Sequence, residues 1–467
     1  MDRFVKEGVR AEGLIPVFVS KTFPNHYSIA TGLYPENHGL IGNHFYDPKF
    51  EEHYSLSDRS KVEDPKFYSG EPIWVTAEKQ GIQSASYFWV GTEAPIKGIY
   101  PSRWKRYDHE YPFESRVDSI VSWFSLPENE RPRLCLLYFH EPDHTGHDTG
   151  PKSKETAAMV SQMDSLFGTL LAKLNALTIA SDLNIIVVSD HGMAEISSEQ
   201  TVNLADYIDM NLVTQEGSGP YSLLYGAEHT TMKKAVQALN GAPHITAYLK
   251  EDIPERFHFK NHYRIKDVLV LADEGWYIQN QAISSLSEAG EYIPKGGTHG
   301  YDNQLRSMQA LFIAGGPAFK PGTVTPPFEN VNIYPLISHI LNIDPHPDMD
   351  GDWVTLADLS VSCWRSHLRR EILRLSVSVL LKDLMSERQT FLWRLGFSCS
   401  AFRVFYSSVN RTFTILRSIS ARRLLSSSGR FMTFAVIVKR CDFSSHASSI
   451  TTAWSPSRNR RRPSYLL

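Results

Sequence analysis

Three separated stretches of the sequence carry Asp and His residues in patterns that could bind metal ions. Asp190 and His191 follow a run of apolar, mostly β-branched residues in LNIIVVSDHG. Asp143 and His147, in HEPDHTGH, are four residues apart, which places two side chains on one face of a helical turn. His299 stands between glycines in KGGTHGYDN. Carboxylate oxygens and imidazole nitrogens are zinc ligands, so these five side chains could form two mixed Asp/His sites.

Each of these motifs also has a simpler explanation. Asp-His-Gly is a common polar turn, HEPDHTGH could be a solvated loop, and a single histidine is more often structural than a ligand. The neighbouring His140, Glu141 and His144 also leave the choice of ligands in that loop open.

A hydroxyl that could act beside two metal ions lies upstream. Thr22 is part of KTFPNHY, a segment with the composition of a loop. A threonine hydroxyl is a weak nucleophile unless a metal ion or a base activates it. In a two-metal site, one ion activates the nucleophile while the other prepares water or stabilises the leaving oxygen, which suits phosphoryl transfer.

The elements that must position these residues follow an α/β pattern. Apolar runs over 133–139 and 183–188 predict strands buried on both faces, and 154–177 between them predicts a long amphipathic helix. Ligands bind beyond the carboxyl ends of strands in such sheets. Further helices are expected over 1–10, 72–80, 113–126 and 331–341, and extended segments or strands over 14–19, 83–90 and 309–314. A less regular lobe near 215–295 is expected to hold a helix near 232–239 and strands over 245–249 and 268–272.

Charge divides the chain into two parts. Residues 1–360 carry roughly 29 Lys and Arg against about 47 Asp and Glu, and the remainder carries roughly 19 against about 4. An acidic body does not favour a nucleic-acid partner. We therefore expect one domain over 1–355, which holds all of the candidate ligands and Thr22, and a basic, Ser/Arg-rich tail over 356–467 that is disordered or spurious, with a membrane-surface segment as the alternative. The sequence shows no signal peptide, transmembrane run or disulfide framework.

Four motifs, taken in order, resemble those of the nucleotide pyrophosphatase/phosphodiesterase family, an arm of the alkaline phosphatase superfamily. They are KTFPNHYSIATGLYPENHGLIGN, EPDHTGH, SDHG and GGTHGYDN. The likeness covers about residues 1–355 and is greatest to short animal cell-surface members. It implies a mixed, mostly parallel sheet flanked by helices, and an extracellular or cell-surface location. Membrane association follows only from this resemblance.

The resemblance also implies a reaction and roles for single residues. Two Zn²⁺ ions would support hydrolysis of phosphodiester or pyrophosphate bonds in a nucleotide or dinucleotide, with release of nucleoside 5′-monophosphates. Thr22 would be the nucleophile and a ligand of one zinc, and Asn43 would hold the phosphoryl oxyanion. The other implied groups are one zinc site (Asp143, His147 and His299), a second zinc site beside Thr22 (Asp190 and His191) and an aromatic pair that stacks the base (Phe23 and Tyr107).

The chain departs from the family pattern at its start. Members begin with a strand that ends in Asp-Gly-Phe-Arg or similar, whose Asp is a sixth metal ligand. No such strand precedes Met1, and Asp2 falls in a helical context. We therefore expect the sheet to lack its first, central strand. Besides a nucleotide phosphodiesterase, the sequence leaves open a phosphocholine or sulfate ester hydrolase of the same superfamily, and a catalytically inactive binding or receptor-like relative.

Overall fold

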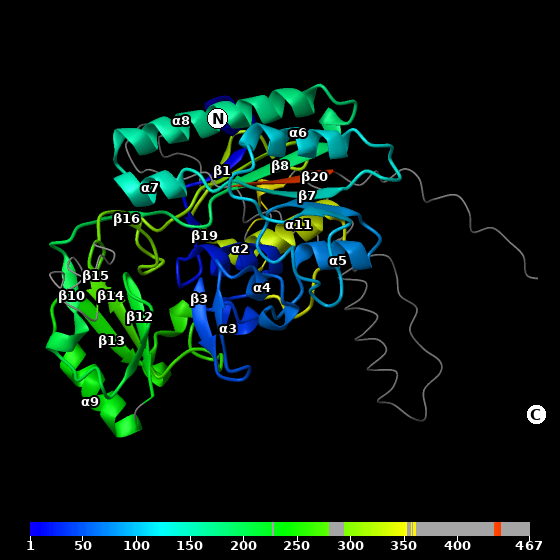
Figure 1. Cartoon of the computed structure of the whole chain (residues 1–467). Coiled ribbons are helices and arrows are strands. Elements are labelled where there is room, and N and C mark those ends of the chain that lie inside the picture. Colours follow the sequence, from blue (N-terminus) through cyan, green and yellow to red (C-terminus); the bar gives the residue numbers. More distant parts are fainter. Residues whose placement is uncertain (227, 280–293, 353–355, 357, 361–433, 440–467) are drawn as a thin grey trace, which may run out of the picture.

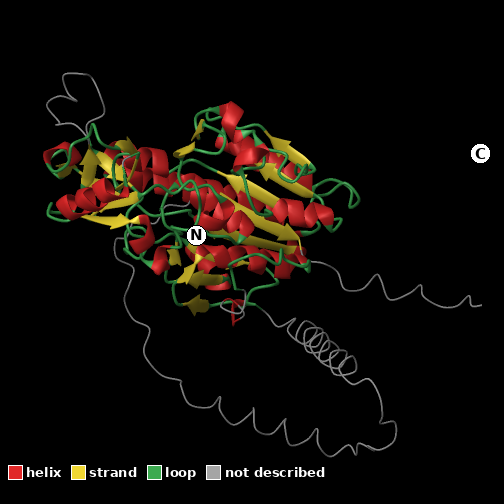
Figure 2. Cartoon of the chain, turned by 90° about the horizontal axis from the view of Figure 1, so that it is seen from below, coloured by secondary structure: helices red, strands yellow, loops and turns green. Residues whose placement is uncertain are grey.

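The chain folds into a main body built on one large sheet and a smaller lobe beside it (Figure 1). The computed structural model describes residues 1–226, 228–279, 294–352, 356, 358–360 and 434–439. In Figure 2, helices flank the strands of the main body, and the lobe lies to its left. None of the helices in these described ranges combines the length and the apolar character needed to cross a membrane.

The main sheet has eight strands in the order β18-β1-β17-β8-β20-β7-β5-β6. Their bounds, in that order, are Thr323–Thr325, Val9–Ala11, Phe312–Gly315, Leu183–Val188, Phe434–Lys439, Leu134–Tyr138, Ser84–Tyr87 and Arg103–Lys105. β17 and β20 run antiparallel to their neighbours, and the other strands share one direction. The expected mixed, mostly parallel α/β sheet is therefore confirmed.

Side chains of the central strands alternate between two helical layers. On β8, Ile186 and Val188 point into one core, and Ile185 and Val187 point into the other. Full burial of one such side chain contributes roughly 1.5–3 kcal/mol, so the sheet is held from both sides. The helices over the first core are α2 (Thr22–Thr31), α5 (Ile73–Lys79) and α11 (Ile333–Leu341), and those over the second are α6 (Phe113–Phe124) and α8 (Lys154–Asn175).

The helix α8 shows why the sequence pattern was informative. Ser153 caps its start, because the side-chain oxygen accepts a hydrogen bond from the Thr156 N–H at 3.0 Å. Its apolar stripe, including Met163 and Leu170, is buried in the second core. The helix joins β7 to the parallel strand β8, which confirms the expected strand–helix–strand unit.

Three expected elements differ in extent. The helix expected over 1–10 ends early, as α1 (Asp2–Glu7), because Val9–Ala11 instead pair with β17 and β18 as strand β1. The strand expected over 83–90 stops at the end of β5, and the extended segment 14–19 contains only the short strand β2 (Leu14–Ile15). These ends depend on pairing with distant strands, which local pattern does not encode.

The first element of the chain is α1, and the centre of the main sheet is filled by a strand from the basic tail. β20, from the basic tail, lies between β7 and β8 and pairs with both. Val436 is opposite Leu136 on one side and Ile186 on the other. Six residues of the segment expected to be disordered or spurious thus belong to the main sheet, whereas most of the rest of that tail lies outside the described residues.

The lobe is a regular antiparallel sheet with one helix. Its strands, in the order β11-β12-β14-β13, are Thr214–Glu216, Tyr221–Tyr225, Val268–Ala272 and Ile245–Leu249, and its helix is α9 (His229–Leu239). Both strands and the helix predicted in this region are confirmed, although residues 280–293 lie outside the described part of the chain.

Arg264 joins the lobe to the main body. Its guanidinium is 2% exposed, and its Nε donates to Asp47 Oδ2 at 2.6 Å. Its Nη1 donates to the backbone oxygens of Gly39 and Phe67 at 2.7 and 2.9 Å. Asp47 ends β3 (His44–Asp47), so this buried ion pair ties the lobe to a strand of the main body.

The remaining elements are short connections around the sheet. They are α3 (Pro35–His38), β4 (Glu52–Ser55), α4 (Arg59–Val62), α7 (Asp143–Thr149), β9 (Ala194–Ile196), β10 (Thr201–Asn203), β15 (Tyr277–Gln279), β16 (Gly296–Thr298) and β19 (Phe328–Glu329).

Candidate active site

The first candidate metal group lies on a short helix and beside a short pair of strands. Asp143 and His147 lie on α7, directly after β7, and His299 follows β16. β16 pairs antiparallel with β9, with Thr298 opposite Ala194, and this pairing brings His299 back beside the end of β8. Gly296 permits the approach, because a Cβ there would lie 2.1 Å from the backbone oxygen of His147.

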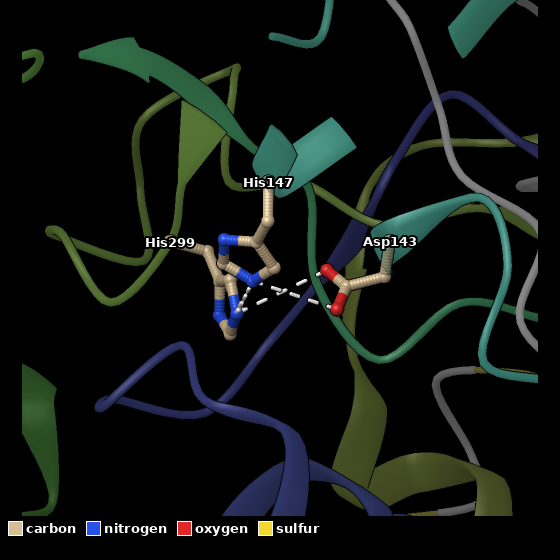
Figure 3. Close-up of side chains that lie close together, drawn as sticks. All are labelled: Asp143, His147 and His299. Carbon is tan, nitrogen blue, oxygen red and sulfur yellow. Dashed lines mark hydrogen bonds and ion pairs between the residues drawn. The ribbon is translucent and has the colours of Figure 1, made fainter. Parts of the chain in front are cut away.

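These three side chains converge on one point (Figure 3). His147 Nε2 lies 3.5 Å from Asp143 Oδ2 and 3.2 Å from His299 Nε2. Two ligands of a tetrahedral zinc ion are separated by about 3.3 Å, since the metal–ligand bonds are roughly 2.0–2.1 Å long. The spacing of this donor set therefore fits a zinc-sized ion. Within the described ranges it is the one cluster of three or more acidic, histidine or cysteine ligands that could hold a metal.

Hydrogen bonds at the far side of the imidazoles orient their ligand nitrogens. Nδ1 of His147 lies 2.8 Å from the Gly297 oxygen, and Nδ1 of His299 lies 2.7 Å from the Ser20 oxygen. A backbone carbonyl only accepts, so each Nδ1 carries the proton and each Nε2 presents a lone pair. This arrangement is typical of metal-binding histidines.

The second candidate group is more deeply buried and includes the hydroxyl. Asp190 and His191 follow β8 and are each 2% exposed. His191 Nε2 lies 3.2 Å from Asp190 Oδ2 and 3.4 Å from Thr22 Oγ1. The His191 Nδ1 again faces a carbonyl, that of Gly192, at 2.9 Å. The structure thus brings the Thr22 hydroxyl to the predicted second site.

The two groups are adjacent. The rings of His191 and His299 stack with centroids 3.4 Å apart and an interplanar angle of 10°. Gly192 allows the chain to leave β8 at this point, because a Cβ there would lie 1.9 Å from the Ser307 oxygen. All five predicted Asp and His ligands therefore lie in one site. Within the HEPDHTGH loop, Asp143 and His147 are the two side chains that converge with His299.

The electrostatics of the second group favour a negatively charged Asp190 beside a positively charged His191. Burial by itself raises the pKa of Asp190, but the neighbouring His191 and His26 outweigh it and hold the pKa below the usual range. Burial lowers the pKa of His191, and the Asp190 carboxylate reverses this effect and raises it. Burial lowers the pKa of Lys21 to about 8, against the opposing effect of Asp143.

Thr22 is held at the start of α2. The preceding loop is fixed by Asn25, whose Nδ2 donates to the oxygens of Val19 and Lys21 at 3.0 and 2.8 Å. The positive end of a helix dipole and its unpaired N–H groups favour an anion at this position. Asn43 lies beside it, and its Oδ1 accepts the Phe23 N–H at 2.9 Å, which leaves the Nδ2 amide as a donor at the pocket surface.

A pocket of about 290 Å³ opens onto these groups. Phe23 and Tyr107, the predicted base-stacking pair, both line it, as do Thr22, Asn43 and the first metal group. Sequence reasoning missed Arg59 and Glu93, which form an ion pair in its wall. Glu93 also accepts the Tyr107 backbone N–H. Neither residue lies in a recognisable motif, because their ion pair forms only when two segments distant in the sequence come together.

Comparison with known proteins agrees with this geometry. The family model described as "Type I phosphodiesterase / nucleotide pyrophosphatase" matches residues 1–302. The venom phosphodiesterase CdcPDE of Crotalus durissus collilineatus is 38% identical over 353 residues, which are 74% of this chain and 41% of the relative. Ectonucleotide pyrophosphatase/phosphodiesterase family member 3 of Rattus norvegicus is 36% identical over 349 residues, 73% of this chain and 39% of the relative. The chain thus spans about two fifths of the length of these curated relatives.

Solved structures show the same relationship. Murine ectonucleotide pyrophosphatase/phosphodiesterase 5 matches with a TM-score of 0.71 and 34% identity, over 77% of this chain and 94% of that one. An inactive threonine-to-alanine variant of that murine protein, in complex with AMP, matches with a TM-score of 0.71 and 33% identity, over 77% and 93%. The chain belongs to the type I phosphodiesterase/nucleotide pyrophosphatase family, within the alkaline phosphatase superfamily.

Proposed function

We propose that this chain is a zinc-dependent hydrolase of nucleotide phosphodiester or pyrophosphate bonds, and that residues 1–355 hold its catalytic machinery. One observation carries the proposal: Thr22 lines a pocket that also has aromatic rings in its wall, and its hydroxyl lies 3.4 Å from a candidate metal ligand, His191. The AMP complex of the murine relative supports a nucleotide as the substrate.

The donor chemistry supports two zinc ions. Asp143, His147 and His299 would hold one ion, and Asp190, His191 and the Thr22 hydroxyl would hold the other. When bound, the ions supply positive charge that lowers the pKa of a hydroxyl and stabilises oxyanions on phosphorus.

The residues of the chain account for a double displacement. The Thr22 hydroxyl gives up its proton to solvent and Oγ1 attacks phosphorus, so that the new O–P bond forms and the bond to the leaving oxygen breaks, the electron pair going to that oxygen. Asn43 Nδ2 and the start of α2 donate hydrogen bonds to the phosphoryl oxygens. Water then attacks phosphorus of the nucleotidyl-threonine, the bond from Thr22 Oγ1 to phosphorus breaks, Thr22 Oγ1 takes up the proton that the water loses, and a nucleoside 5′-monophosphate is released. Phe23 and Tyr107 hold the base.

Two alternative functions fit the pocket less well. A phosphocholine or sulfate ester hydrolase would use the same metals, but the aromatic pair in the pocket favours a planar base. A non-catalytic binding protein would need no nucleophile, whereas Thr22 is positioned beside the second group. By analogy with ectonucleotidases and venom enzymes, we propose a cell-surface or secreted location.

The first test is hydrolysis of the p-nitrophenyl ester of thymidine 5′-monophosphate with zinc supplied. We expect Thr22→Ala to lower kcat by roughly 10³-fold or more, because no other hydroxyl replaces the nucleophile. Zinc at the Asp143 site should remain, as measured by elemental analysis. Thr230→Ala, in the first turn of the lobe helix α9, is the matched control.

The results of this experiment distinguish the proposed function from the two alternatives. Near-normal turnover by Thr22→Ala would refute the nucleophile assignment. A wild-type chain that binds zinc and nucleotide but turns over no ester would favour the binding protein, and cleavage of a choline or sulfate ester alone would favour the second hydrolase.

A further inference from the structure

Three histidines outside both metal groups line the same pocket. We call His109, His140 and His144 the imidazole arm. His140 lies two residues beyond β7, His144 is on α7, and His109 lies two residues after Tyr107. None of them belongs to the converging group of Asp143, so the proposed metal chemistry does not use them.

The arm is an aromatic surface. The rings of His109 and His140 stack with centroids 3.9 Å apart and an interplanar angle of 19°. The ring of His144 packs edge-on against His109 at 5.6 Å, and Phe113 packs edge-on against His140 at 5.0 Å. The hydroxyl of Tyr107 lies 3.0 Å from His109 Nδ1, so the arm is joined to the proposed base-stacking ring.

Charges around the arm do not favour a polyphosphate. His144 Nε2 faces Asp148 Oδ2 at 3.9 Å. Burial beside His109 and Arg116 lowers the pKa of His140 to about 3, which keeps its imidazole neutral. Among the described residues that line the pocket, Arg59 is the one lysine or arginine, and it is paired with Glu93.

The proposed reaction directs the leaving group toward this arm. Thr22 lies at the Asp190/His191 group, and the leaving oxygen departs roughly in line with and opposite to the nucleophile. In a two-metal site that oxygen is stabilised by the other ion, here the one proposed at Asp143 and His147. His144 is on the same helix as these two ligands.

We infer that the imidazole arm binds a planar aromatic leaving group, the second nucleoside of a dinucleotide, by stacking. This inference rests on the proposed function. Thr22 Oγ1 would form a bond to the first phosphorus, and the bridging oxygen would leave with its electron pair as part of the second nucleotide. Water would then release the first nucleotide from Thr22.

The test compares two substrates that transfer the same adenylyl group. Diadenosine 5′,5′-diphosphate loses AMP as the leaving group, and ATP loses pyrophosphate. We expect the ratio of their kcat/KM values to fall about tenfold in the His109→Ala/His144→Ala variant, since stacking of one base on an aromatic side chain is lost. His109→Phe keeps a ring without an N–H group and should largely preserve the ratio.

A matched control and a second readout make the result decisive. His229 lies in the lobe, and its side chain is 59% exposed beside Glu251, as that of His144 is 59% exposed beside Asp148. His229→Ala should therefore leave the ratio unchanged. An unchanged ratio in the double variant, or a larger loss with ATP than with the dinucleotide, would overturn the inference. If the double variant does not fold, the ratio for His144→Ala decides, with an expected fall of at least threefold.

Failure of the proposed function is distinguishable from failure of this inference. A wild-type chain that does not hydrolyse the chromogenic ester would refute the enzyme. Calorimetric binding of the dinucleotide to Thr22→Ala, with and without the His109/His144 substitutions, would then still test the arm. Equal affinities would overturn the inference.

Discussion

The two candidate metal groups differ in how complete they are among the described residues. The Asp143 group has three donors that converge on one point, and its Asp143 and His147 side chains are 24% and 36% exposed. The Asp190 group has one carboxylate and one imidazole, both almost fully buried, and Thr22 supplies the neighbouring oxygen. The first group resembles a site that could hold an ion by itself, whereas at the second a hydroxyl lies beside two candidate ligands.

This difference assigns separate tasks to the two groups. Protein donors nearly fill a tetrahedral shell at the first group, so an ion there should bind without help from the hydroxyl. At the second group, burial strengthens the interaction of any ion with the Asp190 carboxylate and the Thr22 oxygen. Substitutions at the two groups should therefore have distinct effects on metal content and turnover.

Among the substitutions that test this comparison, removal of the His299 side chain should have the largest effect. We expect His299→Ala to lower kcat by roughly 10³-fold or more and to remove one zinc per chain, because the remaining Asp143 and His147 offer only two donors. Elemental analysis of the purified variant measures the zinc. His244→Ala, a lobe histidine that is 42% exposed beside Asp273, is the control. Retention of both zinc ions would show that the converging group is not a metal site.

A smaller effect is expected at the oxyanion donor. Asn43→Ala should lower kcat by about 10²–10³-fold, the usual cost of removing one such donor, and leave both zinc ions in place. Single-turnover kinetics with the chromogenic ester would place the loss in the chemical step. Asn211→Ala, in the lobe, is the control, since its side-chain amide donates a hydrogen bond to Asp209 two residues away. A change in KM alone would assign Asn43 to substrate binding.

The smallest effect on turnover is expected from a change in the proposed base-stacking pair, Phe23 and Tyr107. Tyr107→Ala should raise KM about tenfold and change kcat little, because stacking of a base is lost while the metal groups are intact. Tyr107→Phe should restore most of the affinity. Tyr207→Ala, at a 37% exposed position in the loop after β10, is the control. Equal losses in Tyr107→Ala and Tyr107→Phe would indicate that the hydroxyl, and not the ring, is needed.

The sequence alone predicted the candidate metal ligands, because their residue types and spacing are typical of metal binding. The i, i+4 pair on α7 and the Asp-His pair after β8 were identified because their types and spacing are unusual beside apolar strands. Thr22 was a candidate because a hydroxyl beside metal ions can act in phosphoryl transfer, whereas its role as nucleophile and the aromatic pair came from the family resemblance. In the structure Thr22, Phe23, Tyr107, Asp143 and His147 line one pocket, and His191 lies directly beside Thr22.

What sequence did not predict depends on contacts between distant segments. Arg59 and Glu93 meet in the pocket wall from positions 34 residues apart, and neither lies in a motif. The choice of ligands within HEPDHTGH needed His299, which β16 brings into place. The pairing of β20 between β7 and β8 joins residues about 250–300 positions apart, so no local period could indicate it.

The buried pair between Arg264 and Asp47 has a consequence for how the molecule melts. A lobe held to the body only by exposed contacts would unfold separately, with its own calorimetric peak. Here, opening the lobe would strand a charged carboxylate in the interior, which costs about 3–5 kcal/mol when one partner of such a pair is lost. Lobe and body should therefore lose structure together, in one cooperative transition. Because Asn43 directly precedes the strand that ends in Asp47, the same ion pair also anchors the segment that carries Asn43 to the lobe.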